Sequence, residues 1–210
     1  MFKPDEILNL IRESYGTGEP ILTEDLDSLF SGVSRRTLFS YIDSLIKGGS
    51  LRRYETGIYY IPVRNEAGES ALNPLKVIAR KYLGTEGEPD GFWSGATLDN
   101  SIGLTEQVPT KYEVVTNNTG TAQKTVKVGG FLECIIRKSK IPVDADNIKA
   151  QQLLDILSRR RPKQLSKEQI AVLQGFARGL SFSNLMSMSA SWPQKTTRRV
   201  LESEACGVFA

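Results

Sequence analysis

The stretch that decides the fold is SRRTLFSYIDSLIKGGSLRRYETGIYYI, residues 34–61, which Pro62 ends. Ser34 has the side chain of a helix N-cap, because its oxygen can accept from the first free backbone N–H groups. After it, apolar residues recur at helical spacing on one face: Leu38, Ile42 and Leu45. Gly48-Gly49 then supplies the left-handed conformation that terminates a helix without steric cost. The pattern predicts a capped helix from Ser34 to Lys47.

Two short runs rich in aromatic and β-branched residues follow that helix, at 51–55 and 58–61. Glu55-Thr56-Gly57 forms a tight turn between them, and Pro62 cannot continue the second strand. A capped helix followed by a basic hairpin is typical of the back half of a winged helix-turn-helix. In such a domain the helix lies in the major groove of DNA and the wing lies along the backbone.

The polar face of the helix supports DNA binding. Arg36 can offer two donors to a guanine, and Thr37 and Ser40 are short enough to reach base edges or phosphates. Arg35 falls on the flank, where a phosphate contact is expected. The predicted DNA-binding residues are Ser34, Arg35, Arg36, Thr37, Ser40, Lys47, Arg52 and Arg53. The alternative is a basic, solvated helix in a winged helix that binds protein.

Charge is polarised along this part of the chain. Residues 34–53 hold five basic side chains against the single acid Asp43, whereas residues 5–27 hold seven acids and only Arg12. The predicted domain is therefore positive where a phosphate backbone would lie.

The flanking segments complete the expected order of helix, helix, turn, helix and wing. Residues 4–15 form a first helix, 21–22 a short strand, and Thr23 caps a second helix. The polar stretch 64–71 is expected to be a linker. The predicted domains are a winged helix-turn-helix over 1–64 and a second α+β domain over 72–210.

The second domain is expected to be mixed α/β with a small antiparallel sheet and a helical C-terminus. Helices are predicted at 74–83 and 93–104, strands at 111–117, 123–128 and 131–137, with the first two strands pairing antiparallel. Four further helices are predicted at about 147–158, 166–178, 181–188 and 194–204, the second opened by a capping box of Ser166 and Gln169.

The composition and the missing motifs exclude several classes of enzyme and metal site. Histidine is absent, which closes off Ser-His-Asp and Cys-His nucleophiles and histidine-ligated metals. The sequence contains no GxxxxGK[ST] phosphate loop, and no GxGxxG motif follows a predicted strand. The two cysteines, Cys134 and Cys206, suggest neither a disulfide framework nor a zinc site. The sequence also has no membrane span and no secretory signal, so a cytoplasmic protein without enzymatic activity, cofactor or metal is expected.

The densest basic cluster lies at Arg159, Arg160, Arg161 and Lys163. Residues 145–210 carry ten basic side chains against five acidic ones. The cluster is either a solvated helix C-terminus, where cations are favourable, or a second surface for phosphate or an acidic partner. On the second interpretation, the three arginines could be replaced by alanine with weaker DNA binding and an intact fold.

The stretch GFWSGATLDNSIGLTEQVPTKYEVVTN, residues 91–117, resembles the central signature of the AbiEi-type antitoxins of type IV toxin–antitoxin systems. The matching elements are a small-residue helix start at 94–98, Gly103-Leu104-Thr105, Gln107-Val108-Pro109, and a strand ending in Thr116-Asn117. Asn73-Pro74 opening a helix and the N-terminal winged helix also look like the family. The resemblance covers about residues 1–155.

The resemblance implies a bacterial, cytoplasmic transcriptional autorepressor that acts in phage defence. Such a protein would bind inverted repeats in its own promoter through the winged helix. It would counter a co-encoded nucleotidyltransferase-like toxin through its C-terminal domain, without a stable complex. The alternative is an enzyme docked by the winged helix, with candidate polar groups at Asp90, Asp99, Asn100 and Glu106. Solvent-exposed helix and turn positions are the simpler explanation of those four residues.

Overall fold

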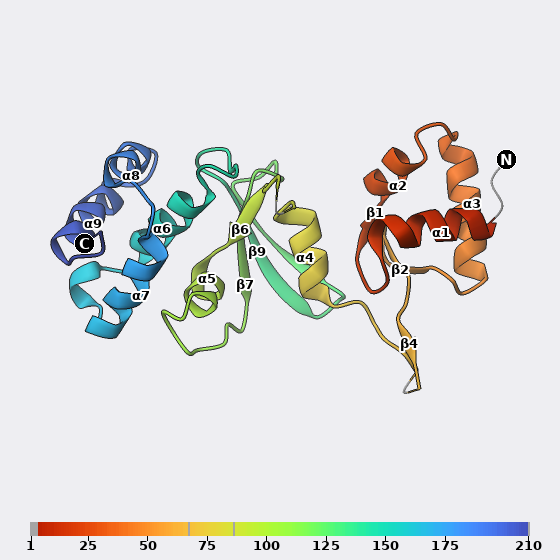
Figure 1. Ribbon diagram of the computed structural model, residues 1–210, viewed down its shortest axis with the longest axis horizontal. Coiled ribbons are helices and arrows are strands. Elements are labelled where there is room, and N and C mark those ends of the chain that lie inside the picture. The colour runs from red at the N-terminus through yellow and green to blue at the C-terminus, as the bar shows by residue number, and fades with distance from the viewer. Residues whose placement is uncertain (1–3, 67, 86, 210) are drawn as a thin grey trace. The chain divides into compact units, whose positions relative to one another are not determined.

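The structure is a computed structural model that describes residues 4–66, 68–85 and 87–209. It is an α+β protein of helices and small sheets (Figure 1). The chain divides into two compact units, called unit 1 and unit 2 below. Unit 1 comprises Met1–Lys81 with Val128–Gly130, and unit 2 comprises Tyr82–Lys127 with Phe131–Ala210.

Three helices of unit 1 pack around its apolar core: α1 (Pro4–Tyr15), α2 (Thr23–Leu29) and α3 (Arg35–Lys47). The predicted first helix is confirmed at both ends. Each helix turns its apolar stripe inward, as helical periodicity requires. The core includes Ile7 and Ile11 of α1, Leu26 of α2, and Leu38, Ile42 and Leu45 of α3.

The ends of α3 confirm the expected caps. The Oγ of Ser34 accepts a hydrogen bond from the backbone N–H of Thr37 at 3.2 Å. At the other end Gly49 has φ +72°, the left-handed conformation that glycine adopts freely. The decisive helix therefore begins and ends where its sequence predicts.

A three-stranded sheet in the order β1-β3-β2 accompanies the helices. Its strands are β1 (Ile21–Leu22), β2 (Arg52–Glu55) and β3 (Ile58–Tyr60), and β3 pairs antiparallel with both neighbours. Gly57, in the turn between β2 and β3, has φ +77°. The predicted strands and the turn between them are confirmed.

The cap of α2 differs from the prediction. Thr23 is the first residue inside the helix, and its hydroxyl donates to the carbonyl of Gly57 at 3.2 Å. The backbone N–H of Leu22 instead donates to the carboxylate of Asp25 at 2.8 Å. An acidic side chain in the first turn can accept a hydrogen bond from the backbone N–H that precedes the helix. The threonine hydroxyl is therefore not needed as a cap, and it connects α2 to the β2–β3 turn instead.

The predicted linker forms a small hairpin of β4 (Arg64–Asn65) and β5 (Gly68–Glu69). Helix α4 (Pro74–Tyr82) follows, and its basic side chains pair with acids of unit 1: Lys76 with Glu19, and Arg80 with Asp25. The compact units consequently divide near Tyr82 and not in the polar stretch before residue 72.

Unit 2 is built on a four-stranded sheet in the order β6-β7-β9-β8. The strands are β6 (Gly91–Trp93), β7 (Tyr112–Thr116), β8 (Gln123–Val128) and β9 (Leu132–Lys138). β6 pairs antiparallel with β7, and β7 pairs parallel with β9.

Three expectations for this sheet are wrong. The sheet is mixed and not purely antiparallel, and β8 lies beside β9 where pairing with β7 was predicted. Gly91–Trp93 is a strand, so the helix α5 begins only at Gly95 and spans Gly95–Ser101. A three-residue strand carries too little alternation to be recognised in sequence, and strand order is set by tertiary packing that no local pattern records.

Helices dominate the rest of unit 2: α6 (Ile148–Arg159), α7 (Lys167–Ala177), α8 (Phe182–Ser189) and α9 (Gln194–Ala205). A 3-10 turn, η1 (Pro162–Gln164), connects α6 to α7. The four predicted helices are confirmed, as is the capping box of Ser166 and Gln169. Their core includes Leu153, Leu157, Leu173, Leu185 and Val200.

Candidate nucleic-acid interface

The outward face of α3 is a shallow hollow lined by polar and charged side chains and one aromatic ring. The residues that line it are Arg36, Phe39, Ser40, Asp43, Ser44 and Lys47. They recur at helical spacing on the side opposite the buried stripe, so they share one face of the helix. The hollow brings together three of the predicted DNA-binding residues: Arg36, Ser40 and Lys47.

These three side chains are exposed and uncommitted. Within the described residues, neither Arg36 nor Lys47 forms an ion pair or a side-chain hydrogen bond, and the hydroxyl of Ser40 also has no protein partner. A guanidinium in this position keeps its donors available for a planar or anionic partner. Among the described residues, the face of α3 therefore holds two positive charges without a carboxylate partner.

The first turn of α3 is organised differently. Ser34 and Thr37 hydrogen-bond to each other through their hydroxyls at 2.7 Å, as part of the helix cap. Arg35 pairs with Asp27 at 3.2 Å and lies 5.9 Å from the ring centre of Phe39. Arg35 is nevertheless well exposed, so its ion pair is weak and its guanidinium can exchange partners.

The two arginines of β2 differ from each other. Arg52 makes two hydrogen bonds to the carboxylate of Glu69, at 2.6 and 3.1 Å. This hydrogen bond raises the pKa of Arg52 and lowers the pKa of Glu69. Arg53 has only a 3.9 Å contact with Asp43 and lies 5.6 Å from the ring centre of Tyr59. Arg52 is thus occupied in joining β2 to the β4–β5 hairpin, whereas Arg53 is loosely held.

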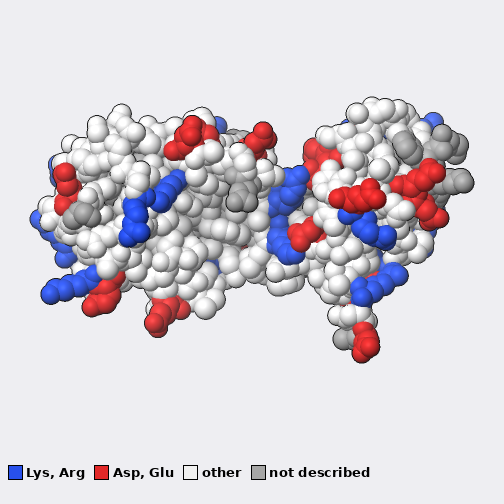
Figure 2. Space-filling view, in the orientation of Figure 1, with Lys and Arg blue, Asp and Glu red and all other residues white. Residues whose placement is uncertain are grey.

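Asp43 is the one acidic side chain among the described residues that line the hollow. Figure 2 shows acids gathered on the face of unit 1 that carries α1, whose first turn contributes the exposed residues Asp5 and Glu6. The unpaired cations of the hollow belong to α3. The charge polarity expected from the sequence is therefore distributed over different helices of the same unit.

Sequence reasoning missed Arg64. Its guanidinium donates to the carbonyl of Gly49, the residue that follows the C-cap of α3, at 2.5 Å, and also contacts Glu69 at 3.4 Å. The sequence predicts a linker at Arg64, because a polar stretch containing glycine carries no signal for a two-residue strand. The pairing of Arg64 with the end of α3 appears only in three dimensions.

The second basic cluster is an ion-pair network in unit 2. Arg159 donates to both carboxylate oxygens of Asp99 at 2.9 Å and to Asp155 at 3.0 Å. Arg160 also donates to Asp99, at 3.0 Å. Burial acts to lower the pKa of Arg159, but hydrogen bonds and charge from the two carboxylates outweigh it and raise that pKa.

Only part of the predicted cluster is open to a partner. Arg161 contacts Glu202 at 3.3 Å from an exposed position, and Lys163 is exposed with no ion pair among the described residues. Asp99 is 1% exposed, so removing Arg159 would leave a buried carboxylate short of partners. The expectation that all three arginines can be replaced without harm to the fold is inconsistent with this geometry.

The polar groups considered for an enzymatic site do not converge. Asp99 is buried in the ion-pair network, whereas Asp90 and Glu106 are exposed. The amide of Asn100 donates to the carbonyl of Thr105 at 3.3 Å, within its own loop. Within residues 4–66, 68–85 and 87–209, no group of three or more acids or cysteines is arranged to hold a metal ion.

Comparison with known proteins gives few relatives. No protein-family model matches the chain, and no curated protein matches it. The crystal structure of the RV2827C protein from Mycobacterium tuberculosis is similar to it, with a TM-score of 0.49 and 14% sequence identity. That similarity covers 96% of this chain and 75% of the RV2827C chain. Among the helices that the structure describes, none has the length and apolar character of a membrane span.

Proposed function

We propose that unit 1 is a winged helix-turn-helix that binds double-stranded DNA and that the protein is an autorepressing antitoxin of the AbiEi type. The order α1, β1, α2, α3, β2, β3 and the β2–β3 hairpin after a capped α3 support this assignment. In that arrangement α3 is the recognition helix and β2–β3 is the wing.

The observation that carries the proposal is the pair of free cations on the outward face of α3. Arg36 and Lys47 are exposed and have no carboxylate partner among the described residues, whereas Arg52 is held by Glu69. Positive side chains without internal partners can neutralise phosphates without first breaking an ion pair. Their position on a rigid helix also fixes their spacing, which base reading requires.

The residues of the face divide into two roles. Arg36, near the N-terminal end of α3, is suited to donate twice to a guanine, since the N-terminal residues of a recognition helix reach base edges. Lys47, at the last helical position, is suited to a phosphate. Arg35 and Arg53 can join phosphates because their own ion pairs are weak and exposed.

Binding is tested by fluorescence anisotropy with a duplex from the region upstream of the protein's own reading frame and with a scrambled duplex. Arg36→Ala is expected to weaken operator binding by about 1–3 kcal/mol and to flatten the preference for the operator. Lys47→Ala is expected to weaken both duplexes and to lower the slope of log affinity against log salt by about 0.9.

Arg12→Ala is the matched control, because Arg12 is an exposed arginine of the same unit that lies on α1. It removes the same charge from unit 1 without touching α3. Equal losses in the Arg36, Lys47 and Arg12 variants would indicate an effect of net charge alone. Unchanged operator binding in the Arg36 and Lys47 variants would reject α3 as the recognition helix.

The antitoxin role requires a separate measurement. Co-expression of the chain should restore growth to cells that produce the nucleotidyltransferase-like protein encoded beside it, and the two proteins should not co-purify. A second contribution to DNA binding from the C-terminal helices is tested with Lys163→Ala, which leaves the ion pairs of Arg159 and Arg160 in place. An unchanged salt slope in that variant would remove Lys163 from the interface.

A further inference from the structure

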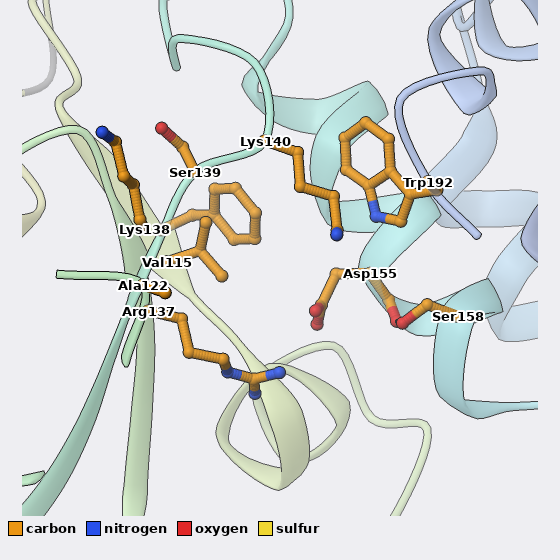
Figure 3. Close-up of a pocket in the computed structure, with 10 residues that line it drawn as sticks. Val115, Ala122, Arg137, Lys138, Ser139, Lys140, Asp155, Ser158 and Trp192 are labelled. Atoms are coloured by element: carbon orange, nitrogen blue, oxygen red, sulfur yellow. The ribbon is translucent and has the colours of Figure 1, made fainter. Parts of the chain in front are cut away.

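A pocket of about 340 Å³ opens in unit 2 between the sheet and α6 (Figure 3). This volume lies within the range of small-molecule sites, roughly 300–1,000 Å³. β6, β7 and β9 supply the sheet side, and α6 and the segment between α8 and α9 supply the other. Every lining residue belongs to unit 2, so the pocket is independent of the proposed DNA-binding face.

The strand register explains the floor of the pocket. Phe92 pairs with Val115 across β6 and β7, and Val115 pairs with Arg137 across β7 and β9. Residues aligned in register point to the same face of a sheet. Phe92 and Val115 therefore form an apolar floor, and Trp192 faces it from the helical side (Figure 3).

The charges already paired in the wall are not available to a ligand. Arg137 forms an ion pair with Glu113 and donates to the hydroxyl of Ser94 at 3.3 Å. Asp155 accepts from that hydroxyl at 2.9 Å and from Arg159 at 3.0 Å. These contacts neutralise one cation and one anion of the wall.

Lys140 and Trp192 supply donors that have no acceptor among the described residues. Figure 3 shows the ammonium group of Lys140 extending into the pocket, with the indole nitrogen of Trp192 turned toward the same space. Within the described part of the chain, neither side chain forms a hydrogen bond or an ion pair. An ammonium and an indole N–H can only donate. The open part of the pocket thus presents donors and positive charge beside two aromatic rings.

We propose that this pocket binds a small anion carrying a flat aromatic ring, with the size and chemistry of a nucleoside monophosphate. The ring lies between the Phe92–Val115 floor and Trp192, where aromatic surfaces stack favourably. The anionic group accepts from Lys140 and from the indole N–H. Charge-assisted hydrogen bonds of this kind are about twice as strong as neutral ones.

Lys138 provides an internal control. It follows Arg137 directly on β9, and alternation along a strand sends its side chain to the opposite face. Figure 3 shows the Lys138 side chain directed away from the pocket, although Lys138 is among the residues that line it. Lys138 and Lys140 are both exposed lysines, two positions apart, so replacing either one changes the net charge equally.

Tryptophan fluorescence can report binding directly. The chain has two tryptophans, and Trp93 pairs with Val114 and lies against Tyr112 on the other face of the sheet. Trp93→Phe therefore leaves Trp192 as the only tryptophan, beside the proposed ligand. We expect the full-length Trp93→Phe protein to show saturable quenching with at least one of the 5′-monophosphates of adenosine, guanosine, cytidine and uridine. The matching nucleoside and inorganic phosphate should each bind more weakly.

The lysine variants in this background decide the mode of binding. Lys140→Ala should raise the dissociation constant about tenfold or more, from the loss of one charge-assisted hydrogen bond, whereas Lys138→Ala should change it less than about twofold. Trp192→Phe keeps an aromatic ring, although a smaller one, removes the N–H donor and should weaken binding measured by calorimetry. Absence of saturable binding with all four nucleotides, or equal effects of the two lysine changes, would overturn the proposal. Circular dichroism of each variant verifies that unit 2 stays folded.

Discussion

The ion-pair network around Asp99 predicts that neighbouring arginines contribute very unequally to stability. Arg159 contacts both oxygens of a carboxylate that is 1% exposed, and its own side chain is 25% exposed. Arg161 contacts Glu202 from a side chain that is 51% exposed. Removing one member of a buried pair leaves an uncompensated charge, whereas an exposed pair contributes little.

We expect Arg159→Met to lower the free energy of unfolding of unit 2 by about 3 kcal/mol, near the lower end of the range for broken buried pairs. The lower end applies because Arg160 continues to donate to Asp99 at 3.0 Å. Methionine retains most of the apolar stem, which limits the loss of packing. Arg161→Met, the matched control, should cost about 0–1 kcal/mol.

Urea unfolding followed by tryptophan fluorescence measures this difference. Both tryptophans, Trp93 and Trp192, belong to unit 2, so the signal reports that unit even when unit 1 unfolds separately. The double variant Asp99→Asn with Arg159→Met should recover part of the loss, because it removes the buried charge together with its partner. A difference between the Arg159 and Arg161 variants smaller than about 0.5 kcal/mol would refute a stabilising role for the buried network.

Three further predictions follow from local geometry. Gly95→Ala should destabilise unit 2 by more than the roughly 1–2 kcal/mol expected for Gly103→Ala. Both glycines have positive φ, but only at Gly95 would the new Cβ meet the Glu113 carboxylate, which would have to shift from its ion pair with Arg137; equal losses in urea unfolding would contradict this. The pKa of Glu69 lies below its ordinary value of 4.5 because of its hydrogen bond from Arg52, so its contribution to stability is present above pH 4.5 and is lost as the pH falls through the depressed pKa; an NMR titration should show that pKa rise toward 4.5 in Arg52→Ala. Burial and the nearby charge of Glu113 raise the pKa of Cys134 to about 12. A thiol reagent should therefore modify only Cys206 in the native protein, even at about pH 9. Rapid reaction of both thiols would contradict the burial of Cys134.

The helices could be read from the sequence because their signals are local. Ser34 and Ser166 each accept from a backbone N–H three residues ahead, and that spacing is visible without any tertiary information. The apolar stripe of α3 likewise depends only on helical periodicity. The same reasoning failed for Thr23, because the competing acceptor Asp25 and the distant Gly57 carbonyl decide which group caps α2.

The sheet of unit 2 depended on information that the sequence does not display. The parallel pairing of β7 with β9 places a strand formed later in the chain between β7 and β8. Alternation identifies the strands but does not determine their order, because several pairings bury the same apolar faces. The pocket above this sheet was missed for the same reason: its floor depends on the register of three strands.

At the candidate DNA-binding face, the composition of a basic stretch does not predict which of its cations are already paired with acids. Arg36 and Arg52 both lie within a basic stretch, and both were predicted to contact DNA. The difference between them is a carboxylate: Glu69 reaches Arg52 from a hairpin seventeen residues further along, at 2.6 Å, whereas no acid among the described residues pairs with Arg36. A cation that is already paired must lose one partner to gain a phosphate, so its net contribution to binding is smaller. The triple arginine at the end of α6, residues 159–161, is the extreme case, since the densest positive charge in the sequence includes two side chains bound to a buried acid. The cations available to a nucleic acid are therefore those that folding leaves without carboxylates, and on this basis Arg36 and Lys47 are expected to dominate the salt dependence of DNA binding.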